Sequence, residues 1–418
     1  MAHPSEASST ISASDQSEVI ARSDVEGRHR SSVLGLLQSG FVLLATVIGC
    51  QALSASVSSR STVVAITHAD GPAASAAFMG GFAVGVAQVR SCGLDPASID
   101  WIFMAPGDDP TALLGPQVSL LVAPFSADLA IYSQLASQRK LGVLLPYQRG
   151  DSLGSLAELD PEGRLHPVVP SYQQDLNQLA GDLLDQGIQR VMVVADPTDR
   201  SADQAEAFVL AFQGEGGTVE SYEPSLVQSV NSEDAAALER LFKDVSWKGP
   251  QAIVLAAAHD SALAQAFDQA QDSGRLGQRP EALLRVWLLP HHRVRDLSER
   301  SWPQFIVDRP AHGPGWNDFA ALYRRSRGDQ PSLMAAAGFD SARLLALSSL
   351  APPPVSTEGT RDPLGWLDSD REPKPLCAAI ADRLGGKSVR LLGAASDLVS
   401  RPGQSPSGQA ITRLIPGR

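Results

Sequence analysis

Val118-Ser-Leu-Leu-Val122 and Leu141-Gly-Val-Leu-Leu145 are two short aliphatic runs, separated by an amphipathic stretch from about Ala127 to Gln138. Short runs of this kind, apolar without alternation, are typical of strands that are buried on both faces. A helix between two such strands returns the chain to the same end of a sheet, so that the strands pair in parallel. This stretch therefore predicts an α/β fold in which helices cover both faces of a parallel sheet.

The same alternation continues on both sides of this unit, from Thr62 to Leu350. We expect further strands at 63–67, 101–104, 190–195, 218–222, 252–256 and 286–289. We expect helices at 73–90, 172–186, 202–213, 233–243, 261–273 and 333–350, and loops at the Pro- and Gly-rich stretches 351–354 and 401–408. A chain of 418 residues is too long for one compact core and long enough for two domains.

The charge of the chain is acidic, with 46 Asp and Glu against 34 Lys and Arg and a formal net charge of −12. Nucleic acids and anionic lipids bind clustered Lys and Arg, and the sequence has no such cluster. We therefore expect no nucleic-acid partner. The chain contains no His-Glu-x-x-His, Cys-x-x-Cys or phosphate-loop lysine motif, so we expect neither a metal nor a cofactor.

The N-terminal region contains an uncharged apolar run from Val33 to Cys50, with Arg28 and Arg30 just before it. This layout is typical of a secretory signal. The last four residues, Val47-Ile-Gly-Cys50, resemble the lipobox of bacterial lipoproteins, in which cleavage leaves the cysteine first and its sulfur carries a diacylglyceryl group. The alternative is an uncleaved transmembrane helix of borderline length. Both interpretations tether a globular domain outside the cytoplasm, facing the periplasm.

Two cysteines remain besides Cys50, namely Cys92 and Cys377. The compartment permits disulfides, but two distant cysteines do not make a disulfide framework. The sequence leaves open whether they pair.

Several stretches follow one another in a characteristic order between Thr62 and Leu350. They are Gly80-Gly-Phe-Ala-Val-Gly-Val-Ala87, Asp108-Asp-Pro110, Pro124-Phe-Ser126, Asp175-x-x-Gln178, Asn317-Asp-Phe-Ala-Ala-Leu-Tyr323 and the run from Ala335 to Ala346. In this order and spacing they resemble the type I periplasmic binding proteins, specifically the branched-chain amino-acid-binding branch that serves ABC importers. The resemblance implies two doubly wound, Rossmann-like lobes joined by three chain crossings. It also implies an amino-acid-like small-molecule ligand in the cleft between them and an importer permease as partner.

The resemblance divides the chain into four parts. We expect a leader and lipoprotein signal at 1–49 and a tether at 50–61, whose Ser- and Ala-rich composition suits a flexible spacer. We expect a first lobe at 62–165 plus 286–350 and a second lobe at 166–285 plus 351–418.

The candidate ligand-binding residues follow the carboxyl ends of predicted strands, where open α/β sheets bind their ligands. Ser126 precedes a helix whose N-terminal N–H groups would receive a carboxylate, although it also fits a plain helix cap. Arg149 can pair with a carboxylate bidentately, and an Asp of the second lobe can hold an ammonium group. The expected set is Ser126, Ala127, Tyr147, Gln148 and Arg149 in the first lobe and Asp199, Arg200, His259 and Asp260 in the second.

The chain departs from the pattern of these relatives at two turns. They usually place Ser or Ala followed by Thr where this chain has Tyr147-Gln-Arg149, and their Tyr-Gly is replaced by Arg200-Ser201. We therefore expect a small polar or amino-acid-like ligand and do not carry over an aliphatic amino acid.

An enzyme is an alternative, because Gly150-Asp-Ser-Leu-Gly154 matches both a G-x-S-x-G elbow and the signature of one lipase and esterase family. A nucleophilic Ser152 needs a strand directly before it, a helix directly after it and a histidine base. The predicted strand ends at Leu145, Pro161 interrupts the stretch that follows, and no Asp-x-x-His occurs downstream. We therefore expect a binding protein and no catalysis. A further alternative is an envelope lipoprotein that uses the same scaffold to bind a protein partner.

We predict that Cys50→Ser releases the protein from membranes, because the acyl chains that make a stable anchor attach at this sulfur. Metabolic labelling with palmitate, followed by membrane fractionation, checks this, with the wild-type chain as the control. Label that persists in the serine variant would show that the lipobox interpretation is wrong.

Overall fold

A computed structural model describes residues 62–68, 71–95, 99–104, 108–115, 118–150, 153–197, 202–221, 225–277, 283–289, 297, 299–350, 363–399, 401 and 403–418. All of them belong to one compact unit, Val57–Arg418. The expected leader, signal and tether, with Cys50, lie outside the described residues. So do Ser152, Asp199 and Arg200.

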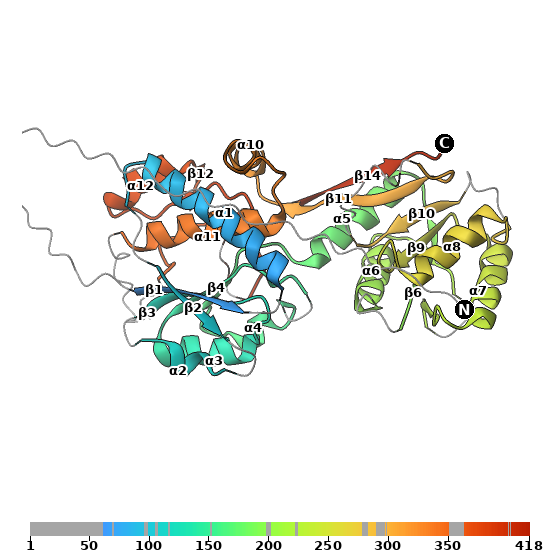
Figure 1. Cartoon of the computed structure of the whole chain (residues 1–418), viewed down its shortest axis with the longest axis horizontal. Coiled ribbons are helices and arrows are strands. Elements are labelled where there is room, and N and C mark those ends of the chain that lie inside the picture. Colours follow the sequence, from blue (N-terminus) through green and yellow to red (C-terminus); the bar gives the residue numbers. More distant parts are fainter. Residues whose placement is uncertain are drawn as a thin grey trace, which may run out of the picture. The chain divides into compact units, whose positions relative to one another are not determined.

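Five parallel strands form the first sheet, in the order β2-β1-β3-β4-β5 (Figure 1). They are β1 (Thr62–His68), β2 (Ile99–Met104), β3 (Val118–Val122), β4 (Gly142–Leu145) and β5 (Leu165–Pro167). The predicted strands 63–67, 101–104, 118–122 and 141–145 are confirmed within two residues, and β5 was not predicted.

Successive side chains of a strand point to opposite faces of the sheet, so the buried runs of β3 and β4 supply two cores. Leu120 and Leu144 pack with α1 (Pro72–Ser91), α10 (Trp316–Arg327) and α11 (Leu333–Ser348). Leu121 and Val143 pack on the other face with α3 (Leu129–Arg139) and α4 (Leu156–Leu159). The first lobe is therefore doubly wound.

The second sheet has the order β14-β11-β10-β9-β6-β7, with β8 also paired to β6 (Figure 1). Its strands are β6 (Arg190–Ala195), β7 (Thr218–Val219), β8 (Val227–Ser229), β9 (Ala252–Ala256), β10 (Leu284–Trp287), β11 (Gln304–His312) and β14 (Gln409–Ile415). Only β14 is antiparallel to its neighbour among these pairs. One face packs on α5 (Tyr172–Asp185) and α6 (Ala202–Gly214), and the other on α7 (Ala235–Lys248) and α8 (Ala262–Asp272). This lobe is doubly wound as well.

The boundaries of the lobes differ from the expected ones in two places. We expected 286–350 in the first lobe, but β10 and β11 pair in the second sheet. We expected 351–418 in the second lobe, but residues between Leu364 and Leu398 pack in the first core, and only β14 joins the second sheet. A buried aliphatic run has the same composition in either sheet, so its pairing partner, and not its own sequence, decides the lobe to which it belongs.

A disulfide joins Cys92, at the C-cap of α1, to Cys377 in α12 (Leu376–Leu384), across 285 residues of sequence. The sequence left this pairing open. The bond ties the first helix of the chain to the segment that returns to the first lobe after α11, and so closes this lobe covalently.

Helices α1 and α11 approach until their backbones touch, because glycines lie at the crossing. A Cβ atom on Gly81 would lie 1.7 Å from the carbonyl oxygen of Ala335, and one on Gly338 would lie 2.0 Å from that of Phe78. Any larger residue at either position would separate the helices. Among the described helices α1 alone has the length and hydropathy of a membrane span; here it packs in the first core.

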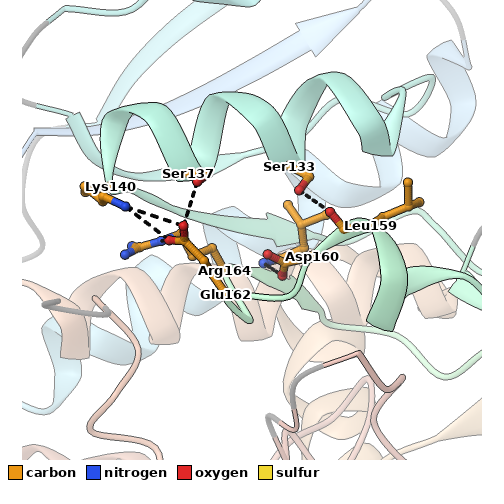
Figure 2. Close-up of polar contacts among 8 residues, drawn as sticks. Ser133, Ser137, Lys140, Leu159, Asp160, Glu162 and Arg164 are labelled. Carbon is orange, nitrogen blue, oxygen red and sulfur yellow. Dashed lines mark hydrogen bonds and ion pairs between the residues drawn. The ribbon is translucent and has the colours of Figure 1, made fainter. Parts of the chain in front are cut away.

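A polar cluster holds the turn before β5 against α3 (Figure 2). Ser133 Oγ donates to the carbonyl oxygen of Leu159 at 2.5 Å, and Glu162 accepts from Arg164 Nε and Ser137 Oγ at 2.7 Å each. The bond from Arg164, then that from Ser137, lowers the pKa of Glu162 to about 2. The cluster anchors the far end of the loop that connects β4 to β5.

We predict that replacing both cysteines, Cys92→Ala with Cys377→Ala, lowers the free energy of unfolding by about 2–4 kcal/mol, since a disulfide restricts the unfolded chain. Urea unfolding of the purified protein measures this loss. Wild-type protein treated with a reductant is the matched control and should resemble the double variant. Equal stability of the oxidised wild type and the variant would contradict a stabilising role for the bond.

Candidate functional site

Three loops meet at the carboxyl edge of the first sheet, and the loops after β3 and β4 are the two that the sequence predicts there. Gly71 follows β1, Phe125 follows β3 and Tyr147 follows β4. A Cβ on Gly71 would lie 2.7 Å from the Phe125 ring, and the rings of Phe125 and Tyr147 are 5.8 Å apart between centroids. Gln148 Nε2 donates to the carbonyl oxygen of Pro124 at 3.0 Å. Burial raises the pKa of Tyr147, which keeps its hydroxyl protonated. The carboxyl edge of the first sheet is therefore a partly aromatic surface whose loops are held in place by contacts with one another.

The helix after β3 begins later than predicted, and this changes the expected role of Ser126. Helix α3 begins at Leu129, and its N-cap is Asp128, whose Oδ1 accepts from Ala130 N–H at 2.9 Å. Ser126 is exposed and Ala127 half-buried, both before the cap. Because a carboxylate already lies at this positive helix end, the end is a poor receptor for a second anion.

Arg149 is buried and its guanidinium has partners within the protein. Nη2 pairs with Asp175 Oδ2 at 2.8 Å, Nε donates to the carbonyl oxygen of Pro170 at 2.8 Å, and the guanidinium carbon lies 4.5 Å from the centre of the Tyr172 ring. The side chains of Arg149 and Asp175 are only 6% and 4% exposed. The residue that we expected to bind a ligand carboxylate therefore already binds a carboxylate of the chain.

The chain crosses between the lobes three times, first between β5 and α5, then between β11 and α10, and finally between Leu398 and β14. The first turn of α5 contacts all three crossings. Asp175 Oδ1 accepts from the backbone N–H of Ala311, near the second crossing, at 2.6 Å. Gln174 donates to the carbonyl oxygen of Pro406 at 2.8 Å and accepts from Gly408 N–H at 2.9 Å, both on the third crossing. Burial raises the pKa of Asp175, while Arg149 and the Ala311 N–H act in the opposite direction. We call this cluster, from Arg149 to Gly408, the hinge cluster.

The structure describes two of the predicted second-lobe residues, His259 and Asp260, and both contact residues of their own lobe. The ring of His259 lies 4.5 Å from that of Trp287 between centroids. Asp260 is exposed, and its carbonyl oxygen accepts from Gln265 Nε2 at 3.1 Å. Ser261 caps α8. These residues do follow the carboxyl end of β9, as predicted, but their part in ligand binding stays a prediction.

A cavity of about 540 Å³ lies beside the hinge cluster and is lined by both lobes. The first lobe supplies Arg149 and Leu153, α5 supplies Tyr172, and α6 supplies Asp203 and Gln204. Of the predicted residues that the structure describes, only Arg149 lines this cavity. Tyr172 and Asp203 were missed. Tyr172 lies in the first turn of α5 and Asp203 in the first turn of α6, and this position at the start of a second-lobe helix was the available signal. The described residues contain no group of three His, Cys, Asp or Glu suited to a metal.

The two lobes, their sheets and the three crossings define the fold of the type I periplasmic binding proteins. Solved structures bear this out. A putative branched-chain amino acid ABC transporter from Rhodospirillum rubrum is similar with a TM-score of 0.55 and 17% identity, over 85% of this chain and 96% of that one.

Two further structures support the same conclusion. An ABC transporter substrate-binding protein from Desulfitobacterium hafniense, in complex with Leu, has a TM-score of 0.53 and 17% identity over 84% of this chain and 96% of its own. A branched chain amino acid ABC transporter periplasmic ligand-binding protein from Burkholderia xenovorans LB400 has a TM-score of 0.52 and 13% identity, over 85% of this chain and 95% of its own. No protein-family model and no curated protein matches this chain. At these identities the likeness shows the fold.

We predict that Asp175→Asn destabilises the protein by about 3–5 kcal/mol, because it leaves the Arg149 guanidinium buried without its counter-charge. Urea unfolding measures the change. Asp185→Asn is the matched control, since this carboxylate lies on the same helix but is exposed, and its effect should stay within about 0.5 kcal/mol.

The double variant Arg149→Leu with Asp175→Leu should be more stable than either single leucine variant, since it removes both charges together. A double variant that loses the sum of the two single effects would contradict a coupled pair.

Proposed function

We propose that this chain is an extracytoplasmic solute-binding protein that delivers a small polar or amino-acid-like ligand to the permease of an ABC importer. The observation that carries the proposal is the cavity beside the hinge cluster, because residues of both lobes line it. A ligand there contacts both lobes at once, so its binding energy favours one relative position of the lobes over others.

The lining of this cavity suits a small polar ligand that carries an ammonium group. Asp203 supplies an anion, while Tyr172, Leu176 and Leu153 supply apolar surface, and the charge of Arg149 is already balanced by Asp175. Pockets for small molecules combine such an apolar wall with a few polar groups that orient the ligand. Asp203 is exposed and would hold an ammonium group.

We place this domain on the outer side of the membrane, held by a lipid on Cys50 through the tether 50–61. The lipobox-like Val47-Ile-Gly-Cys50 and the uncharged run before it support this placement. A tether of this kind leaves the domain free to reach a permease in the same membrane.

We propose that the domain performs no chemistry. β4 ends at Leu145 and the four-residue α4 begins at Leu156, so a long loop separates the strand and the helix around Gly150-Asp-Ser-Leu-Gly154. A nucleophile elbow requires a sharp strand-to-helix turn at the serine. This context supports a binding role over an esterase.

We predict that a thermal-shift screen of amino acids, amides, urea and peptides, with leucine as the first probe, finds a ligand that stabilises the protein. At a hundred times Kd the stabilisation is about 2.7 kcal/mol. Asp203→Asn should weaken that ligand by roughly tenfold or more, the effect of losing a charged hydrogen bond. Isothermal titration measures the affinity.

Glu206→Gln is the matched control, because Glu206 is exposed on the same helix and does not line the cavity. If Asp260→Asn lowers the affinity for the ligand and Asp203→Asn does not, the binding site lies at the loops after β6 and β9 instead. If the screen finds no ligand at all, the alternative of a protein partner replaces this proposal.

A further inference from the structure

The described lining of the cavity beside the hinge cluster contains three groups that attract an anion. They are the Arg149 guanidinium and the N-terminal ends of α5 and α6, since residues in the first turns of both helices line this cavity. A guanidinium pairs with a carboxylate, and the free N–H groups of a helix N-terminus attract one. Whether the chain itself already supplies an anion to each group decides the charge of the ligand.

The carboxylate of Asp175 serves the first two of these groups. It pairs with Arg149 Nη2 at 2.8 Å, and both side chains are nearly buried. Asp175 also lies in the first turn of α5, where its charge balances the positive end of the helix dipole.

The backbone N–H groups at the start of α5 also have partners within the chain. Tyr172 N–H donates to the carbonyl oxygen of Arg149 at 2.8 Å, and Gln174 N–H donates to that of Ser171 at 3.3 Å. Together with the charge of Asp175, these bonds make the guanidinium and the start of α5 poor receptors for a second carboxylate.

The start of α6 carries a carboxylate that has no partner in the chain. Asp203 lies in the first turn of α6, lines the cavity and is exposed. Within the described part of the chain, no hydrogen bond or ion pair involves its side chain. The dipole of α6 stabilises this negative charge, so the third group is also served by an anion of the chain.

The charges around the cavity therefore do not balance. Arg149 and Asp203 are the charged residues of its described lining, and Asp175 neutralises the first of them. One negative charge remains. A cation is attracted to it, whereas a free carboxylate would be repelled and would have no unshared cation to pair with.

The rest of the lining is neutral. Ser171, Gln173, Gln204 and Ser405 supply hydrogen-bonding groups, which orient a polar head but do not neutralise an anion. The rings and aliphatic side chains of the wall, Tyr172, Leu153 and Leu176 among them, suit an apolar body.

We propose that the ligand of this cavity is an organic monocation, with an ammonium head on a small apolar body and no free carboxylate. This inference rests on the proposed function and narrows its ligand to amines and the amides of amino acids, in place of zwitterionic amino acids.

Isothermal titration of the purified full-length protein with isopentylamine and with leucine tests this inference, because the two molecules differ only in the carboxylate of leucine. We expect isopentylamine to bind saturably and roughly tenfold or more tightly than leucine, since the carboxylate finds no unshared cation in the cavity. Isopentanol, which has the same body without the charge, should bind more weakly than the amine.

Two variants assign the amine to Asp203. Asp203→Asn should weaken isopentylamine roughly tenfold or more, the effect of losing a charged hydrogen bond. Glu206→Gln is the matched control, since it removes an exposed charge from the same helix outside the cavity, and its affinity for the amine should stay within about twofold of the wild type. Equal weakening by both variants would indicate attraction to the acidic surface in general and would overturn the inference.

The outcomes also separate this inference from the proposed function. If leucine binds as tightly as isopentylamine and Asp203→Asn weakens both, the monocation class is wrong and the solute-binding function stands. If neither molecule binds, the monocation class is again wrong. The thermal-shift screen then decides the proposed function by itself, because any other ligand that it finds would sustain that function.

Discussion

A carboxylate buried as deeply as that of Asp175 needs a cation and hydrogen-bond donors, since desolvation otherwise opposes its charge. Arg149 supplies the cation from the loop after β4, and the Ala311 N–H supplies a donor from β11. The neighbouring Gln174 binds the chain at Pro406 and Gly408. All three crossings between the lobes therefore meet at one turn of α5, and the relation of the two sheets depends on this turn.

A second buried Asp–Arg pair, Asp340 with Arg343, fixes the segment that returns to the first lobe after α11. Asp340 Oδ2 accepts from the backbone N–H groups of Ala394 and Ala395 at 2.7 Å each, while its Oδ1 pairs with Arg343. Burial raises the pKa of Asp340 to about 6, and Arg343 opposes this shift. Ser396 then donates to the carbonyl oxygen of Val168 at 2.7 Å, next to the first crossing. The two buried Asp–Arg pairs therefore position the chain segments on either side of the hinge cluster.

The position of the hinge cluster determines what the neighbouring cavity offers. Arg149 faces that cavity but is held by Asp175, so the chain uses its most obvious anion-binding group for its own architecture. Most of the other polar residues that line this cavity lie at the starts of α5 and α6.

The sequence by itself determined the elements and the fold class, because short aliphatic runs and amphipathic stretches are local patterns. β3, β6 and β9 lie where their aliphatic runs predicted them. It could also place Tyr147 and Phe125 at one sheet edge, since parallel strands end together. Only the tertiary structure decided that β10 and β11 join the second sheet, that Cys92 meets Cys377 and that Arg149 pairs with Asp175. The strand pairing, the disulfide and the ion pair each join residues that are far apart in the chain. Tertiary packing decides which distant residues meet, and no local sequence pattern encodes that choice.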